Sequence, residues 1–150
     1  MTLQNLLRIG KLKPHATTAD EIARLLASVD RNLADAHVAA VSAETRFDAA
    51  YKAVMQCALV AMMCSGYRPS TSEPGHHATL LQTLPLTLAV DNAVWIVLDA
   101  LRRKRNAIDY TGEPVSADMV DECVMQATQL RTSAKKAATA HARAVGKRST

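Results

Sequence analysis

The sequence predicts an all-α fold, because its interior residues are small or aliphatic and its apolar residues recur with helical spacing. Only 3% of the residues are aromatic, whereas 49% are hydrophobic. Alanine, leucine, valine and methionine must therefore fill the core, and these residues suit packed helices better than a sheet sandwich. No strand-like alternation of useful length and no internal repeat is present. At 150 residues the chain is long enough for one domain with a real core and too short for two.

The first long helix is expected to follow a short apolar arm over residues 1–17, which ends in a turn at Lys13-Pro14. Thr18 is a suitable N-cap, and Glu21, three residues later, completes a capping box. The helix is expected to run to about Ala40 and to place one apolar face toward the core: Ile22, Leu25, Leu26, Val29 and Leu33.

The second long helix is expected between a cap at Ser42 and a stop at Gly66. Its middle, VMQCALVAMMC, is apolar nearly all round. Such a helix is typical of the centre of a bundle, or of a surface that also meets a second subunit.

The remaining elements are a loop, a short helix and two longer helices. The Pro- and Gly-containing segment over residues 67–75 predicts the loop, and a short helix over residues 76–83 is expected to end before Pro85. Asp91 then caps a helix that ends in the basic run LRRKRN, and Ser116 caps the last core helix. The result is a bundle of four or five helices.

Basic side chains gather at the C-terminal end. Residues 131–150 contain six basic side chains and no acidic one, whereas the preceding 130 residues carry 12 basic and 14 acidic side chains. We therefore expect an N-terminal arm over residues 1–17, a helical domain over residues 18–130 and a basic, Ala/Lys-rich tail over residues 131–150, which is a solvated end or an extension of the last helix. Basic tails of this kind hold nucleic-acid backbones without reading their sequence, and the candidate contacts are Lys135, Lys136 and Arg143.

Several classes of protein are not expected. No stretch of about 18 apolar residues and no signal peptide is present, so a cytoplasmic protein with no membrane partner is expected. The cysteines, which are odd in number, are read as free thiols: Cys57, Cys64 and Cys123. We expect no metal, because the adjacent His76 and His77 lack ligand spacing to the other candidates. No cofactor is expected either, since the sequence contains no Gly-rich phosphate loop.

One segment carries more specific information. LRRKRNAIDY, over residues 101–110, contains Arg105 followed by Asn106 and, five positions after the arginine, Tyr110. It resembles the signature of HEPN domains, small helical bundles that often pair through the helices around this motif. Ribonuclease members of that family carry an arginine, usually a polar follower, and a histidine four to six positions after the arginine. The segments RFDAAYKA, GYRP, HHATLLQTLP and LDALRRKRN also resemble small bacterial HEPN proteins, so the likeness covers about residues 20–130.

The resemblance implies a homodimeric component of a bacterial toxin–antitoxin or phage-defence system that binds RNA, in a family whose enzymes are metal-independent ribonucleases. Arg105 would hold a phosphate, because a guanidinium stays charged and presents a fork of donors, and Asn106 and Tyr110 would shape the site. Whether the chain also cuts RNA stays open, because a phenol with a pKa near 10 is a poor base at pH 7. Further phosphate contacts would come from Arg102, Arg103 and Lys104, and supporting contacts from Asp48 and Tyr51.

Two alternatives remain open. The chain is a catalytically inactive helical module that docks on a nucleotidyltransferase or another defence protein through its apolar second helix, with the basic run merely solvated at a helix end that favours cations. Alternatively, it is a DNA-binding accessory protein that depends on the tail. In family toxins paired with a nucleotidyltransferase, the modified tyrosine lies two residues beyond the histidine. Gly112 stands at that position here, so this regulation does not carry over directly, and Tyr110 itself is the alternative target.

Overall fold

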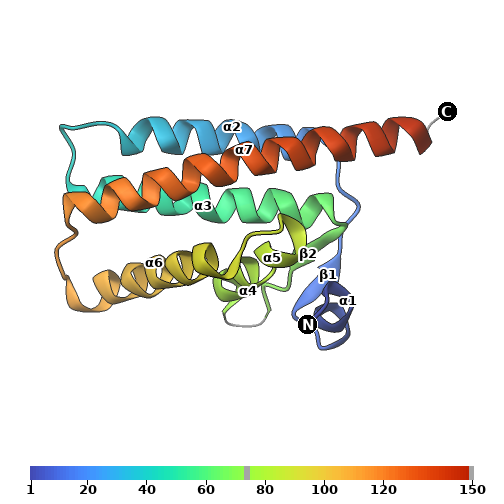
Figure 1. Cartoon of the computed structure of the whole chain (residues 1–150), viewed down its shortest axis with the longest axis horizontal. Helices are drawn as coiled ribbons and strands as arrows, with labels where there is room; N and C mark the ends of the chain where they lie inside the picture. Colours follow the sequence, from blue (N-terminus) through green and yellow to red (C-terminus); the bar gives the residue numbers. More distant parts are fainter. Residues whose placement is uncertain (73–74, 149–150) are drawn as a thin grey trace.

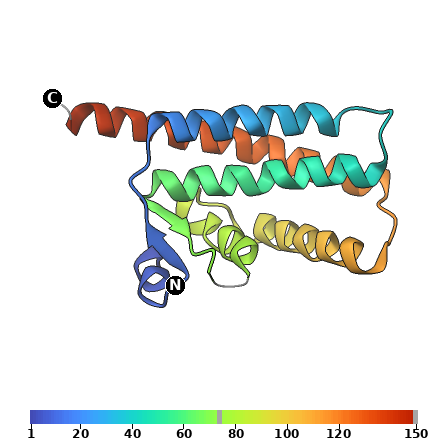
Figure 2. The same cartoon turned by 180° about the vertical axis from the view of Figure 1, so that it is seen from behind.

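Three long helices form the body of the protein in a computed structural model, which describes residues 1–72 and 75–148 and the side chains up to residue 146. They are α2 (Ala19–Ala36), α3 (Ala43–Cys64) and α7 (Ala117–Arg148). α3 packs against both α2 and α7 along most of its length, and α2 also touches α7. Figures 1 and 2 show these helices nearly parallel in their axes. The predicted all-α class is confirmed by this arrangement.

α3 is the central helix because it is apolar on most sides, and its polar residues Asp48, Lys52 and Gln56 follow one another along the remaining side. Twelve of its residues are buried, among them four alanines (Ala50, Ala53, Ala58 and Ala61) that let the neighbouring helices approach closely. By length and composition alone α3 could cross a membrane, but 67% of its most apolar window is buried inside the fold. This burial is that of a core helix. The large apolar side chains of α3 are buried apart from Leu59, which is half-buried, so the apolar surface that α3 leaves open is small.

The helix starts agree with the sequence. Thr18 accepts a hydrogen bond from the Glu21 amide, and the Glu21 carboxylate accepts one from the Thr18 amide, which is the expected capping box. Ser42 and Asp91 cap α3 and α6 (Asn92–Thr111) through the amides three residues later. These caps are local interactions, and for that reason they could be predicted.

The N-terminal segment differs from the expected arm. It forms a short helix, α1 (Leu3–Arg8), and a strand, β1 (Leu12–Pro14), which pairs antiparallel with β2 (Tyr67–Pro69) at the start of the expected loop. Leu6 and Leu12 are buried in the same core as the long helices. Strands of three residues carry too few positions to show an alternating pattern, so no pattern in the sequence predicted them.

The segment between β2 and α6 folds as two short helices rather than one, α4 (His76–Gln82) and α5 (Leu84–Thr87). Pro85 does not end the structure, because it lies in the first turn of α5, where a proline needs no amide donor. α6 lies on the side of α3 away from α2 (Figures 1 and 2), and only three of its residues are buried: Leu98, Asp99 and Leu101. Much of α6 is therefore open to solvent.

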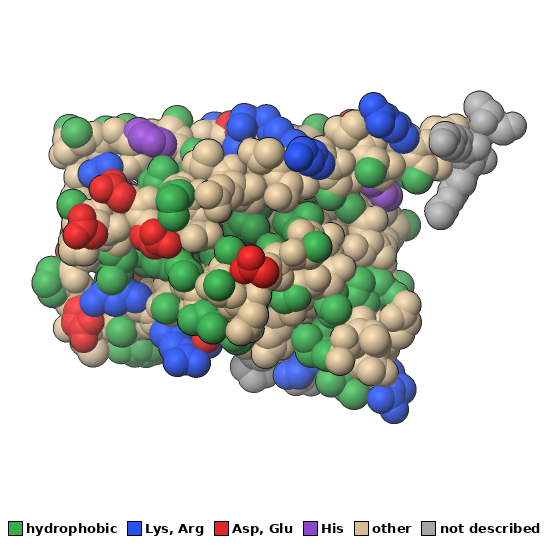
Figure 3. Space-filling view, in the orientation of Figure 1, with side chains coloured by type: hydrophobic (Ala, Val, Ile, Leu, Met, Phe, Trp, Pro, Cys, Tyr) green, Lys and Arg blue, Asp and Glu red, His purple; other side chains and the backbone are tan. Residues whose placement is uncertain are grey.

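The expected boundary at residues 130/131 falls inside α7, which continues without a break to Arg148. Leu130 and Ala134 are buried, and Ala138 packs against the core, so the start of the basic tail belongs to the body. The last turns of α7 extend past the other helices (Figure 1). Figure 3 shows acidic side chains near the end where α6 passes into α7, and basic side chains over the C-terminal half of α7. Residues 149–150 of the tail and 73–74 of the loop lie outside the described residues.

Candidate functional site

A cavity of about 550 Å³ lies where α3, α4 and α6 meet the segment after β2. Its charged and aromatic side chains come from three helices, α3, α4 and α6. The lining residues are Asp48, Tyr51, Lys52, Met55, Gln56, Leu59, Pro69, Thr71, His76, His77, Leu80 and Arg105. The volume is in the range of small-molecule and nucleotide pockets.

Arg105 of α6 is held from three directions. Its Nε lies 3.0 Å from Oδ1 of Asp48 on α3, and its Nη1 donates to Asp109 one turn along α6. Its Cζ lies 5.9 Å from the centroid of the Tyr51 ring, a cation–π distance. The contacts expected from Asp48 and Tyr51 are therefore present. At least three of the five guanidinium N–H donors face neither carboxylate, so they are free for a ligand oxygen.

Tyr51 is a neutral platform rather than a proton-transfer group. Its side chain is buried, and burial raises the pKa of its hydroxyl to about 12, against a smaller opposing effect of Arg102 and Arg105. That hydroxyl meets no hydrogen-bonding partner among the residues that the structure describes. Its ring supports both Arg105 and His77, whose ring centroid lies 6.0 Å away.

His77 adds an imidazole to the same cavity. Burial lowers its pKa below the usual 6.5, and the charges of His76, Arg105 and Arg102 lower it further. A neutral imidazole at pH 7 has a free nitrogen lone pair and can accept a proton. The ring of His76 stands edge-on to it at a centroid distance of 4.8 Å. The cavity thus combines a fixed cation with two imidazoles.

Asn106 and Tyr110 do not line this cavity. Tyr110 is 89% exposed, and Asn106 is exposed as well. The reason is that α6 continues as a regular helix to Thr111, and five residues along a helix turn the side chain by roughly 140°. Within one chain, the tyrosine at the motif's histidine position therefore points away from Arg105.

The other basic residues of α6 have acidic partners. Nε of Arg102 lies 2.9 Å from Asp99 Oδ1, and Nη2 of Arg103 lies 3.0 Å from Asp99 Oδ2. Nζ of Lys104 lies 2.7 Å from Glu113 Oε2. These ion pairs lie on the surface of α6 and the segment that follows it. None of the three basic residues lines the Arg105 cavity.

The basic residues of α7 lie elsewhere on the molecule. Arg131 pairs with Asp30 of α2, its hydrogen bond lowers the pKa of that carboxyl, and Lys135 Nζ lies 3.9 Å from the same carboxylate. Lys136 and Arg143 are exposed and line a shallow hollow on α7. The tail residues and the α6 motif thus form separate surfaces.

No group of three or more metal-ligating side chains occurs in the described part of the chain. Cys57, Cys64 and Cys123 are free thiols, as expected. Burial raises the pKa of Cys57 and of Cys123 to about 12, so neither thiol ionises readily or acts as a nucleophile.

Sequence reasoning missed His76, His77 and Lys52 as members of the site, because it weighed the histidines only as metal ligands. The available signal was the adjacent pair directly after a loop, a place where functional side chains concentrate. No family model, no curated protein and no solved structure matches this chain. Its function is therefore inferred from its own residues.

Proposed function

We propose that this protein binds RNA at the Arg105 cavity and cleaves it without a metal ion. The observation that supports the proposal most directly is the presence of Arg105 and a neutral His77 in one cavity of nucleotide size. Arg105 fits a phosphate because its charge is permanent and its remaining N–H donors are fixed by Asp48 and Asp109.

The chemistry would be attack of the ribose 2′-oxygen on the adjacent phosphorus. His77 takes the proton of the 2′-hydroxyl, and the bond between phosphorus and the 5′-oxygen breaks. His76 supplies the proton to the leaving 5′-oxygen, and the products are a 2′,3′-cyclic phosphate and a 5′-hydroxyl. Arg105 stabilises the charge on the non-bridging oxygens. In this scheme His77 performs the proton transfer that Tyr110 cannot.

We further propose that the chain is a HEPN-like, cytoplasmic component of a bacterial toxin–antitoxin or phage-defence system and acts as a homodimer. The support for dimerisation is an uncovered stripe on α6. Ile96 is 55% exposed, and Ala100, Arg103 and Tyr110 follow it on the same helical face. Two copies meeting along this stripe would place Tyr110 at their interface.

The second candidate is an inactive interaction module that docks on a nucleotidyltransferase or another defence protein. It is favoured by the two carboxylates at Arg105, because Asp48 and Asp109 together more than offset its charge. In this reading the Arg105 cluster only fastens α6 to α3, and the exposed face of α6 meets the partner.

The test expresses the wild-type chain and four single variants in cells and follows growth and RNA integrity: Arg105→Gln, His77→Gln, Tyr110→Phe and a control. Arg105→Gln and His77→Gln are each expected to lower RNA cleavage by about 100-fold or more, since each removes a group that acts in the transition state. Arg8→Gln is the control, because Arg8 is exposed on α1 and lies outside the cavity.

Circular dichroism must show that the variants remain folded. A wild-type chain that leaves RNA intact would reject the nuclease and favour the interaction module. Cleavage that survives His77→Gln but not Tyr110→Phe would move the proton transfer from His77 to Tyr110.

A further inference from the structure

A second cavity, of about 500 Å³, lies beside the Arg105 cavity, between α2, α3 and β2. The two cavities share four lining residues: Gln56, Leu59, Pro69 and Thr71. They therefore form one groove that runs across α3, from the histidines of α4 to the first turns of α2. We call it the α3 groove.

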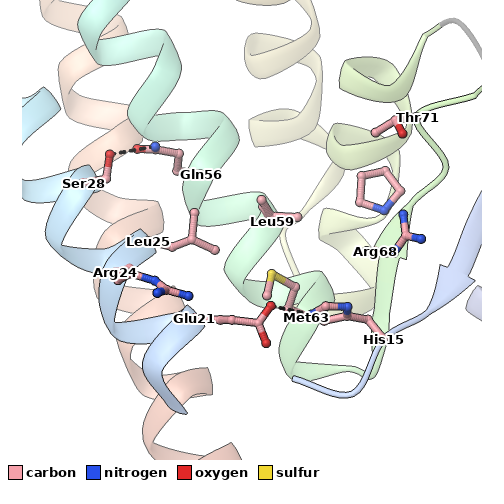
Figure 4. Close-up of a pocket in the computed structure, with 11 residues that line it drawn as sticks. His15, Glu21, Arg24, Leu25, Ser28, Gln56, Leu59, Met63, Arg68 and Thr71 are labelled. Carbon is pink, nitrogen blue, oxygen red and sulfur yellow. Dashed lines mark hydrogen bonds and ion pairs between the residues drawn. The ribbon is translucent and has the colours of Figure 1, made fainter. Parts of the chain in front are cut away.

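The second cavity has an apolar floor, and its walls carry two arginines and the His15–Glu21 pair. Leu25, Leu59 and Met63 form the middle of the floor (Figure 4). Arg24 stands on the α2 side of this floor, and Arg68 stands on the opposite side, on β2 (Figure 4).

The cations of the α3 groove are available for a ligand. Arg24, Arg68 and Lys52 form no ion pair or side-chain hydrogen bond with another described residue, whereas His15 is bound to Glu21 at 2.7 Å. The basic residues of α6 and α7 discussed above, apart from Lys136 and Arg143, do have acidic partners. Unpaired cations on both sides of an apolar floor are suited to an organic polyanion that carries flat apolar groups between its charges.

Polar groups at one wall suit a base edge. Gln56 accepts a hydrogen bond from Asn32 and donates one to Ser28, each 2.8 Å long, so the amide is fixed between α2 and α3. The second N–H of Gln56 and the hydroxyl hydrogen of Ser28 remain as donors. An unpaired base lying on the aliphatic floor would find these donors at its edge.

We propose that the α3 groove binds single-stranded RNA next to the cleavage site, with one base on the floor of the second cavity and its flanking phosphates on Arg24 and Arg68. The proposal rests on the RNA-binding function inferred above and deepens it by naming the substrate class. The floor can hold a base only if that base is unstacked, and unstacked bases belong to single strands, loops and bulges. A duplex keeps its bases stacked and presents its phosphates on a wide cylinder, so it cannot fill a groove of this size.

Binding is best measured with RNA that cannot be cut. The probe is a short fluorescein-labelled oligouridine with 2′-O-methyl riboses, and the readout is fluorescence anisotropy with the full chain. Arg24→Gln together with Arg68→Gln is expected to weaken binding by about tenfold or more and to reduce its salt dependence, because two phosphate contacts are lost. Arg8→Gln is the matched control, because Arg8 is exposed on α1 and lines neither cavity; it is expected to bind within about twofold of wild type, since isolated surface charges contribute little.

The outcomes separate the α3 groove from the nuclease. If the double variant loses RNA binding and the wild-type chain cuts no RNA, the result supports RNA binding in the α3 groove and rejects the proposed nuclease activity. Three results would each overturn RNA binding in the α3 groove, even if the wild-type chain cuts RNA. They are unchanged binding in the double variant, an equal loss of binding in Arg8→Gln, and equal affinity for duplex RNA. A thermal melt of the double variant identical to that of wild type excludes unfolding as the cause.

Discussion

Arg105 meets groups from two different helices within a few ångströms, and this crowding defines the site at the residue scale. Asp48 and Asp109 fix the guanidinium, and Tyr51 lies beneath it as an uncharged ring. The ring of His77 also contacts the Tyr51 ring, and partial burial and neighbouring cations lower the pKa of His77. Two of these residues allow direct tests.

Tyr51→Phe should leave the fold at least as stable as wild type. The hydroxyl is buried without a described partner, so its removal gives up no hydrogen bond and keeps the ring under Arg105. We expect the free energy of unfolding in urea to rise by up to about 1 kcal/mol, or to stay unchanged. Phe47→Ala, in the adjacent and fully buried ring, should instead cost about 3–5 kcal/mol. A loss above about 1 kcal/mol in Tyr51→Phe would show that the hydroxyl is bonded.

The pKa of His77 should lie below 6.5 and should rise in Arg105→Ala. Removal of the guanidinium takes away a like charge and opens the ring to water, and both changes favour the protonated imidazole. Titration of the ring resonances by NMR measures this shift, with Arg103→Ala as the control. If His77 is the base of the proposed cleavage, cleavage by the wild-type chain should fall as the pH drops through the pKa of His77, because a protonated ring cannot accept the 2′-hydroxyl proton. An unchanged His77 pKa in Arg105→Ala would show that Arg105 does not affect the protonation of His77.

At the element scale, α3 and α6 differ in how much of each helix is buried. α3 packs between α2 and α7, and most of its apolar residues are buried. α6 contacts mainly the short α4 and α5 and the edge of α3, and its outward face is open to solvent. The element with the motif is thus also the element best placed to meet another chain.

Ile96→Glu should separate the proposed dimer without unfolding the monomer. Ile96 is 55% exposed, so a charge there costs the monomer within about 0.5 kcal/mol, whereas in an α6–α6 contact it would be buried. Sedimentation velocity measures the mass of both proteins. Met125→Glu, on the exposed face of α7 at 44% exposure, is the matched control and should remain dimeric. A monomeric wild type, or a dimer that survives Ile96→Glu, would contradict the α6 contact.

At the scale of the whole molecule, the basic tail and the helical body are one structure. α7 carries Leu130 and Ala134 in the core and pairs Arg131 and Lys135 with Asp30 of α2. The tail cannot therefore be removed to test DNA binding without damage to the fold. Charge neutralisation at Lys136 and Arg143, which are exposed, tests that alternative more cleanly.

Deletion of residues 131–150 should lower the melting temperature by roughly 10 °C, which corresponds to about 3 kcal/mol or more in a domain of this size. Ile22 and the end of α3 line cavities together with residues of the α7 extension, so the deletion uncovers them and removes the ion pairs to Asp30. Lys136→Gln together with Arg143→Gln should melt like wild type, as differential scanning calorimetry can show. An unchanged melting temperature in the deletion would mean that the α7 extension contributes nothing to the body.

The sequence by itself determined the helical class, the starts of α2, α3 and α6, and the central place of α3. These features depend on neighbours three or four residues apart, such as Thr18 with Glu21, or on the apolar character of one helix. The contacts of Arg105 with Asp48 and Tyr51 were expected as well.

Only the tertiary structure brought His77 and His76 to Arg105, turned Tyr110 away from it, and joined the two cavities into the α3 groove. Each of these depends on how α4, α6 and β2 pack against α3, and no local spacing encodes that packing. The short β1–β2 pair was decided in the same way, because its two strands are distant in sequence and define each other only when paired.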